Sequence, residues 1–266
     1  GKGAEVIVVW VQNAVFFWVP FVAFFAISAW FGMNDIASAK ASFKEQSVIF
    51  KRRDTWLMCI LYLGTFGSFI GFAAGFGLLM KSQFPQVNAT QYVFLGALIG
   101  AISRVIGGKV SDQLGAARVT TFVFIGMIVA VMGVINFLPV KGVDGSGSFR
   151  GFFVCFIALF ALTGVGNAST FAQVPKIFFA VAKQVLGSKA TPAQLELNSN
   201  KEAAAVLGFS AAIGAYGGFF VPKSYGMSIS ATGGVKAALV AFIVYYVLCL
   251  VINWWFYSRK GAPTPC

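Results

Sequence analysis

Arg104 is the residue whose type and position most strongly imply chemistry. It lies in the otherwise uncharged stretch 92–108, which is long enough to cross most of a bilayer. A guanidinium keeps its charge, and a cation at that depth costs at least about 2.5 kcal/mol, so such a residue normally faces an interior cavity that receives an anion. The alternative is that Arg104 reaches the headgroups, because we expect its helix to end about five residues, or about 7 Å, further on.

Other residues that suit an anion site lie in three more apolar stretches. Tyr62 and Phe66 are four residues apart and therefore share one helix face. The segments 163–171 and 208–222 are rich in glycine and small hydroxyl residues. Glycines spaced by four residues let helices approach closely in lipid, so static packing is the alternative for most of them. A tyrosine hydroxyl, sparse polar groups and exposed backbone among aromatic walls would orient a small anion.

The elements that position these residues are membrane spans. Apolar residues make up 58% of the 266 residues and charged residues 11%, whereas about a quarter of a soluble domain is charged. Stretches long enough to cross a bilayer predict seven helices. Their approximate ranges are Val6–Phe31, Thr55–Met80, Tyr92–Gly108, Val119–Leu138, Phe152–Ala182, Ala203–Val221 and Ala237–Tyr257. The sequence therefore predicts an all-α, multi-pass integral membrane protein in contact with lipid.

The distribution of basic residues predicts the topology. The chain has 20 Lys and Arg residues and 8 Asp and Glu residues, a net charge of +12. With the N-terminus outside and the C-terminus in the cytoplasm, about twice as many basic residues fall in cytoplasmic loops as in outer ones, as the positive-inside rule requires. The basic charge is thus accounted for by topology, and we expect no nucleic-acid partner.

The composition argues against an enzyme. Histidine is absent, the four cysteines have no metal-ligand spacing, and all eight carboxylates map to loops or predicted helix ends. Without clustered carboxylates, a buried acid and base pair or cofactor ligands, we expect no catalytic site, no metal and no cofactor.

The spacing of the helices suggests part of a two-half transporter. A basic polar stretch, 32–54, separates the first helix, 1–31, from six helices over 55–258, and residues 259–266 form a cytoplasmic tail. Six spans after such a linker are what one half of a two-half transporter supplies. The two halves pack around a substrate site near the midplane of the membrane. The chain begins at Gly1 and enters a span almost at once, so it reads as a piece of something longer that includes a first half, on the same or a separate chain.

Specific motifs resemble those of the nitrate/nitrite porter family of the major facilitator superfamily. Segment 208–222 looks like the family's nitrate signature, 163–171 is a companion to it, 108–118 is similar to the superfamily's cytoplasmic loop motif, and 61–76 resembles the seventh helix of nitrate carriers. The resemblance covers essentially the whole chain. It implies the major facilitator fold, with the last helix of the first half followed by the six-helix second half, in the bacterial inner membrane.

The resemblance also implies site residues. Arg104 matches the eighth-helix arginine that grips the substrate together with a partner in the second helix, and Tyr62 and Phe66 match residues that line the site. The signature that brings backbone and small hydroxyls near the anion contributes Gly208, Ser210, Gly214, Gly217 and Gly218. The expected substrates are nitrate and nitrite, planar acceptors that suit an arginine fork.

Each assignment has an ordinary alternative. Tyr62 can be a packed tyrosine, and Phe66 is one of 30 phenylalanines. Three polar residues of 163–171 either contact substrate or satisfy polar groups between helices, namely Asn167, Ser169 and Thr170. Lys176 either extends toward the cytoplasm or adds a cation to the exit path. Asp112, with Lys109 and Arg118, is expected to latch helix ends during transport.

An arginine site predicts a mode of transport. An empty pocket with uncompensated positive charge is costly to close away from water, and a bound anion lowers that cost. The loaded carrier should therefore reorient more readily than the empty one, which favours nitrate/nitrite antiport. The alternatives are nitrate-proton symport, with a titratable group from the other half, and an anion channel, which glycine-rich helices suit less well than a rocking carrier.

Overall fold

The structure, a computed structural model, describes residues 12–34, 42–140, 146–187 and 190–266. The chain divides into two compact units, residues 1–41 and 42–266. Helix α1 (Gln12–Gly32) belongs to the first unit and is built almost entirely from apolar residues. The predicted site residues all lie in the second unit.

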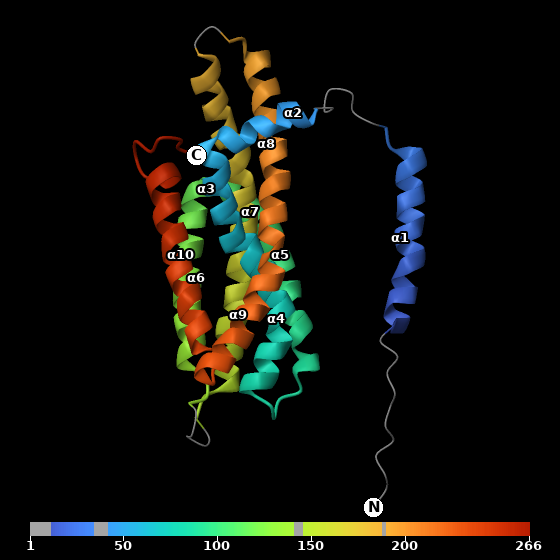
Figure 1. The fold of residues 1–266 in the computed structure, drawn as a ribbon, viewed down its shortest axis with the longest axis vertical. Helices are drawn as coiled ribbons and strands as arrows, with labels where there is room; N and C mark the ends of the chain where they lie inside the picture. The colour runs from blue at the N-terminus through green and yellow to red at the C-terminus, as the bar shows by residue number, and fades with distance from the viewer. Residues whose placement is uncertain (1–11, 35–41, 141–145, 188–189) are drawn as a thin grey trace, which may run out of the picture. The chain divides into compact units, whose positions relative to one another are not determined.

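The second unit is a bundle of helices that run alongside one another (Figure 1). In chain order its elements are α2 (Phe43–Gln46), η2 (Ser47–Lys51), α3 (Arg53–Tyr62), η3 (Leu63–Gly67), α4 (Ser68–Gln83), η4 (Ala89–Gln91), α5 (Val93–Leu114), α6 (Ala116–Asn136), α7 (Phe149–Leu186), α8 (Pro192–Ala215), α9 (Gly217–Thr232), α10 (Lys236–Asn253) and η5 (Trp254–Ser258). Within the described part of the chain all regular structure is helical, which confirms the predicted fold class.

Seven helical segments among the described residues are long and apolar enough to cross a membrane. Each overlaps one predicted span, so the predicted multi-pass organisation is confirmed. The largest difference is the sixth segment, which the sequence placed at Ala203–Val221 and the structure extends to Pro192–Thr232. Its additional first turns are polar and begin with a capping box at Thr191, which hydropathy alone does not detect.

Helices α7 and α8 are longer than a bilayer requires. Helix α7 has 38 residues, which corresponds to about 57 Å at 1.5 Å per residue. Figure 1 shows both helices extending beyond their neighbours at the end of the bundle that carries α2 and the C-terminus. Helix α7 packs against α5, α6 and α8. It therefore contacts both α5, which carries Arg104, and α8, which carries part of the predicted signature.

Glycine permits backbone contact at two helix crossings. A Cβ atom on Gly217 of α9 would lie 2.0 Å from the carbonyl oxygen of Gly67 in η3, and one on Gly164 of α7 would lie 2.1 Å from that of Gly100 in α5. Real Cβ atoms do not approach so closely. Small residues let helices pack at this distance, where van der Waals contacts stabilise helix pairs in lipid.

Aromatic packing occupies many of the phenylalanines in the half of the bundle nearest the start of α7. Phe76 of α4 stacks on Phe156 of α7 with ring centroids 4.6 Å apart, and Phe72 and Phe160 meet them edge to face. All four side chains are fully buried. These residues therefore form a structural core.

The second span contains a wide π-helical turn at Leu63–Gly67, where the sequence suggested an ordinary α-helix. The amide of Ser68 donates to the carbonyl of Leu63, five residues earlier. The buried Thr65 hydroxyl donates to the carbonyl of Leu61. It also lies 3.0 Å from the Thr170 hydroxyl of α7, with which it shares a hydrogen bond. Single π turns inside α-helices occur frequently at functional sites.

Polar contacts close the end of the bundle that carries the C-terminus. Arg52 forms a two-pronged ion pair with Glu202 of α8, at 2.8 and 3.1 Å. The buried carboxylate of Asp54 accepts hydrogen bonds from Tyr257 and Thr264. The tail predicted at 259–266 therefore folds back onto the bundle, and Glu202 lies inside a helix instead of at its end.

Candidate anion-binding site

Arg104 lies well inside helix α5 and faces a cavity. The helix ends at Leu114, about 15 Å beyond Arg104 and further than the sequence suggested. Four α5 residues line a cavity of about 340 Å³ together with three residues of α7; they are Arg104, Val105, Gly108, Asp112, Ala168, Phe171 and Ala172. The structure records no ion pair or hydrogen bond for Arg104 with any described residue.

The position of Arg104 beside α7 follows from the glycines on its own helix. Gly100 and Gly107 lie one turn before and one turn after Arg104, on the same side of α5. A Cβ atom on Gly107 would come within 2.7 Å of Val165 in α7. The two helices are thus in close contact along the face that carries the guanidinium, which holds Arg104 at the edge of their interface.

Tyr62 and Phe66 lie together, as their spacing predicts. Tyr62 is the last residue of α3 and is 3% exposed, and its ring centroid lies 5.3 Å from that of Phe66. Arg104 is near enough to the Tyr62 hydroxyl for the two to interact electrostatically. The hydroxyl forms no hydrogen bond with the described residues. The structure therefore brings an unpaired phenol and an unpaired guanidinium into one region.

The glycines of the predicted signature divide into two groups. Gly214, Gly217 and Gly218 face the segment that carries Tyr62 and Phe66, and a Cβ atom on Gly214 would meet both aromatic rings, at 3.2 and 2.8 Å. Their immediate contacts are with protein, which fits close packing of α8 and α9 onto η3. The Ser210 hydroxyl is buried and donates to the carbonyl of Val206 in its own helix.

Gly208 lies apart from the other signature glycines. It lines a cavity of about 370 Å³ that α2 and η2 form against α8, and no heavy atom lies within 4 Å of the position of a Cβ atom. Arg104 lines a different cavity. The structure thus does not bring Gly208 together with Arg104.

We expect Gly208→Ala to be tolerated. Alanine meets open space at this position and is the better helix former by about 1 kcal/mol, so the unfolding temperature in detergent should stay constant or rise. Transport should stay within about twofold, because surface substitutions away from a site rarely matter more. Loss of transport by a normally folded variant would instead support the anion contact that the signature predicts for Gly208.

The polar residues of 163–171 behave differently from one another. The Ser169 hydroxyl lies 2.7 Å from that of Thr120 in α6, and Thr170 pairs with Thr65. Both hydroxyls therefore satisfy polar groups between helices, which is the alternative to contact with the substrate. Gln173, which the sequence analysis did not single out, donates to the Thr120 hydroxyl at 2.6 Å and extends this buried network.

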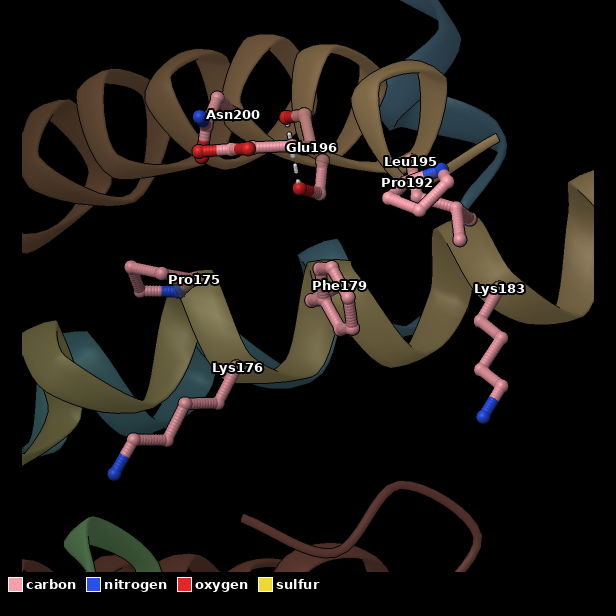
Figure 2. Close-up of a pocket in the computed structure, with 9 residues that line it drawn as sticks. Pro175, Lys176, Phe179, Lys183, Pro192, Leu195, Glu196 and Asn200 are labelled. Carbon is pink, nitrogen blue, oxygen red and sulfur yellow. Dashed lines mark hydrogen bonds between the residues drawn. The ribbon is translucent and has the colours of Figure 1, made fainter. Parts of the chain in front are cut away.

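Lys176 lines a cavity of about 740 Å³ between α7 and the first turns of α8 (Figure 2). Figure 2 shows its side chain and that of Lys183 extending from α7 away from α8, whereas Phe179 lies between the two helices. Burial raises the pKa of the Cys266 thiol to about 12, and the Lys176 ammonium partly offsets that rise. Lys176 therefore lies near the C-terminal residue and in a different cavity from Arg104.

The arrangement around Arg104 suits reversible binding of a small anion. A permanent cation and an unpaired phenol lie among mostly apolar side chains and glycine, and the carboxylate of Asp112 lines the same cavity as Arg104. An arginine fork can donate to two oxygens at once. Among the described residues there is no cluster of three or more metal-ligating side chains.

Three transporters are among the known proteins that the chain resembles, and no protein-family model matches the chain. The chain is 44% identical over 249 residues to the nitrate/nitrite transporter NarU of Escherichia coli (strain K12), an alignment covering 93% of this chain and 53% of that protein. It is 44% identical over 253 residues to NarU of Salmonella typhimurium, with the same coverage, and 37% identical over 262 residues to the probable nitrate/nitrite antiporter NarK2 of Thermus thermophilus, covering 97% and 54%. The chain thus spans about half the length of these relatives, whose names describe transporters and not enzymes.

Proposed function

We propose that this chain, which belongs to the nitrate/nitrite porter family of the major facilitator superfamily, takes part in carrying nitrate and nitrite across a bacterial inner membrane. The observation that carries this proposal is the unpaired guanidinium of Arg104, inside a membrane-spanning helix and beside a cavity. The names of the similar proteins supply the substrates.

The proposed organisation is that of a transporter half with one additional helix. Residues 1–31 would be the last helix of a first half, 32–54 a cytoplasmic linker, 55–258 the six-helix second half and 259–266 a cytoplasmic tail. The two compact units and the half-length alignments are consistent with this organisation. Two such halves surround a substrate site near the midplane of the membrane. The complete transporter therefore includes the other five helices of the first half, on the same or a separate chain.

In the proposed site, Arg104 binds the anion and Tyr62 donates a further hydrogen bond. Phe66 and the glycines at 214, 217 and 218 shape the pocket around them. Nitrate and nitrite are weakly basic anions, so a permanently charged arginine holds them without needing to exchange a proton. Ser210 and Gly208 remain in the proposal as more distant members of the signature, since one bonds to its own helix and the other lines a separate cavity.

The electrostatics of this site favour exchange. Arg104 is exposed in this chain. Closing its unpaired guanidinium away from water against the other half of the transporter is unfavourable by several kcal/mol, and a bound anion removes most of that cost. The loaded carrier should therefore cross between its outward-open and inward-open states much faster than the empty carrier. Nitrate/nitrite antiport is the mode of transport that follows.

We expect trans-stimulation in proteoliposomes that contain the complete transporter. Nitrate uptake into vesicles loaded with nitrite should be at least about tenfold faster than into empty vesicles, because a barrier lower by about 1.4 kcal/mol corresponds to tenfold in rate. A lumenal pH indicator should show no coupled proton movement. Equal rates with and without internal anion, accompanied by acidification of the lumen, would replace antiport by nitrate-proton symport.

A further inference from the structure

Helix α7 carries a row of buried polar side chains through the centre of the bundle. Five of them are 1% exposed or less: Thr163, Asn167, Ser169, Thr170 and Gln173. The three hydroxyl residues and Gln173 have hydrogen-bond partners, either the α7 backbone or side chains of α6 and η3. In a membrane protein such contacts hold helices together.

Asn167 is the exception in this row. Its side-chain nitrogen and oxygen are both buried, and neither has a hydrogen-bond partner among the described residues. In the described part of the chain, three other buried side chains, Thr55, Tyr225 and Asn253, each have one unpaired polar atom, so Asn167 alone there has its whole amide unpaired. Leaving a buried amide without partners is unfavourable, and natural proteins rarely retain one without a functional reason.

The neighbours of Asn167 along α7 define where its side chain lies. Gly164, three residues before it, contacts Gly100 of α5, and Thr170, three residues after it, bonds to Thr65 of η3. Residues three apart lie on neighbouring parts of one helix face. Asn167 therefore lies on the side of α7 that faces both α5 and η3. Helix α5 carries Arg104, and η3 directly follows Tyr62.

Three groups that have no hydrogen-bond partner among the described residues thus lie on neighbouring helices, since α7 contacts both α5 and α3. They are the guanidinium of Arg104 in α5, the hydroxyl of Tyr62 at the end of α3, and the amide of Asn167 in α7. The cavity beside Arg104 is lined by Ala168 and Phe171, which follow Asn167 by one residue and by one turn. Donors that lack protein partners in a low-dielectric site are available to a ligand.

We propose that Asn167 is a further anion-binding residue, and that its amide N–H donates to the nitrate oxygen that the Arg104 fork leaves free. This inference rests on the proposed function. Nitrate has three oxygens and nitrite has two, so a fork that binds two oxygens leaves one oxygen free on nitrate and none on nitrite. Asn167 therefore determines the preference for nitrate over nitrite.

The test is Asn167→Leu in the complete transporter. Leucine has the same number of side-chain heavy atoms and the same branching as asparagine, with no polar atoms, and replacing an unpaired buried amide by an apolar group of the same shape is nearly neutral or stabilising. The unfolding temperature without anion should therefore stay constant or rise. The KM for nitrate should increase at least about tenfold, as expected for loss of a hydrogen bond to a charged group. The KM for nitrite should change by less than about threefold, and the thermal stabilisation by nitrate should shrink.

Thr170→Val is the matched control, because that hydroxyl lies one turn away on α7 and is already bonded to Thr65. It should lower the unfolding temperature and leave the ratio of the two KM values unchanged. A lower unfolding temperature for Asn167→Leu, or equal changes in KM for both anions, would overturn the inference. If the unaltered transporter carries neither anion, the proposed function fails instead, and the two failures remain distinguishable.

Discussion

Arg104→Gln is expected to reduce the kcat/KM for nitrate transport by at least about 100-fold. Glutamine keeps a polar, hydrogen-bonding side chain but removes the charge, and truncating one member of a desolvated charged pair costs about 2–5 kcal/mol, where each 1.4 kcal/mol is tenfold. Because Arg104 has no ion-pair partner among the described residues, its replacement should leave the unfolding temperature nearly unchanged. Nitrate uptake by proteoliposomes and thermal unfolding measure the two effects.

Two further variants separate charge from geometry. Arg104→Lys retains the charge but not the planar fork, so it should fall between the wild type and Arg104→Gln. Lys81→Gln removes an exposed cation in the last turn of α4, which does not line the cavity beside Arg104, and should leave nitrate transport within about twofold. Unchanged oxyanion flux in Arg104→Gln would end the proposal that this residue binds the substrate.

Gly217→Ala is expected to be the most destabilising of the signature substitutions. A methyl group there would lie 2.0 Å from the carbonyl oxygen of Gly67 and 2.5 Å from its carbonyl carbon. These are backbone atoms within a packed helix pair, so relief requires separation of α9 from η3 and α4. Overpacking of this kind costs typically 1–3 kcal/mol and occasionally more, and we expect about 3 kcal/mol. Thermal unfolding in detergent should show a large decrease in midpoint and less monodisperse protein.

Gly226→Ala provides the control on the same helix. Gly226 is exposed, and no heavy atom lies within 4 Å of where its Cβ atom would be. Its replacement should change the stability by less than about 0.5 kcal/mol. If Gly217→Ala is as stable as Gly226→Ala, the backbone contact between Gly217 and Gly67 does not hold these helices together. Normal stability with lost transport would instead favour a direct role of Gly217 in the site.

The sequence predicts the spans well because the membrane imposes the signal. A helix that crosses the hydrocarbon core needs about 20 apolar residues, so hydropathy finds each of the seven segments. The same criterion misses the extensions of α5 and α8, whose last or first turns are polar and lie beyond the apolar stretch. Capping and packing determine those ends, and they leave a weaker signal.

The candidate site was only partly predictable. Arg104 is conspicuous because a charge in an apolar helix is rare, and the i, i+4 spacing of Tyr62 and Phe66 predicts their contact. Which glycine meets backbone and which meets open space depends on how helices distant in sequence cross, as at Gly217 and Gly208. Likewise, Asn167 and Thr170 are similar in sequence context, and only the three-dimensional arrangement leaves one unpaired.

The wide turn at Leu63–Gly67 makes the proposed substrate pocket sensitive to chain length as well as to residue type. A turn closed over five residues holds one residue more than an α-helical turn needs. A single-codon deletion within it would restore regular α-helical winding, remove one side chain from this turn and leave the helical segments on either side close to their present orientation. Natural variants that differ here by one position can therefore present a different set of side chains to the anion without any substitution in the pocket itself.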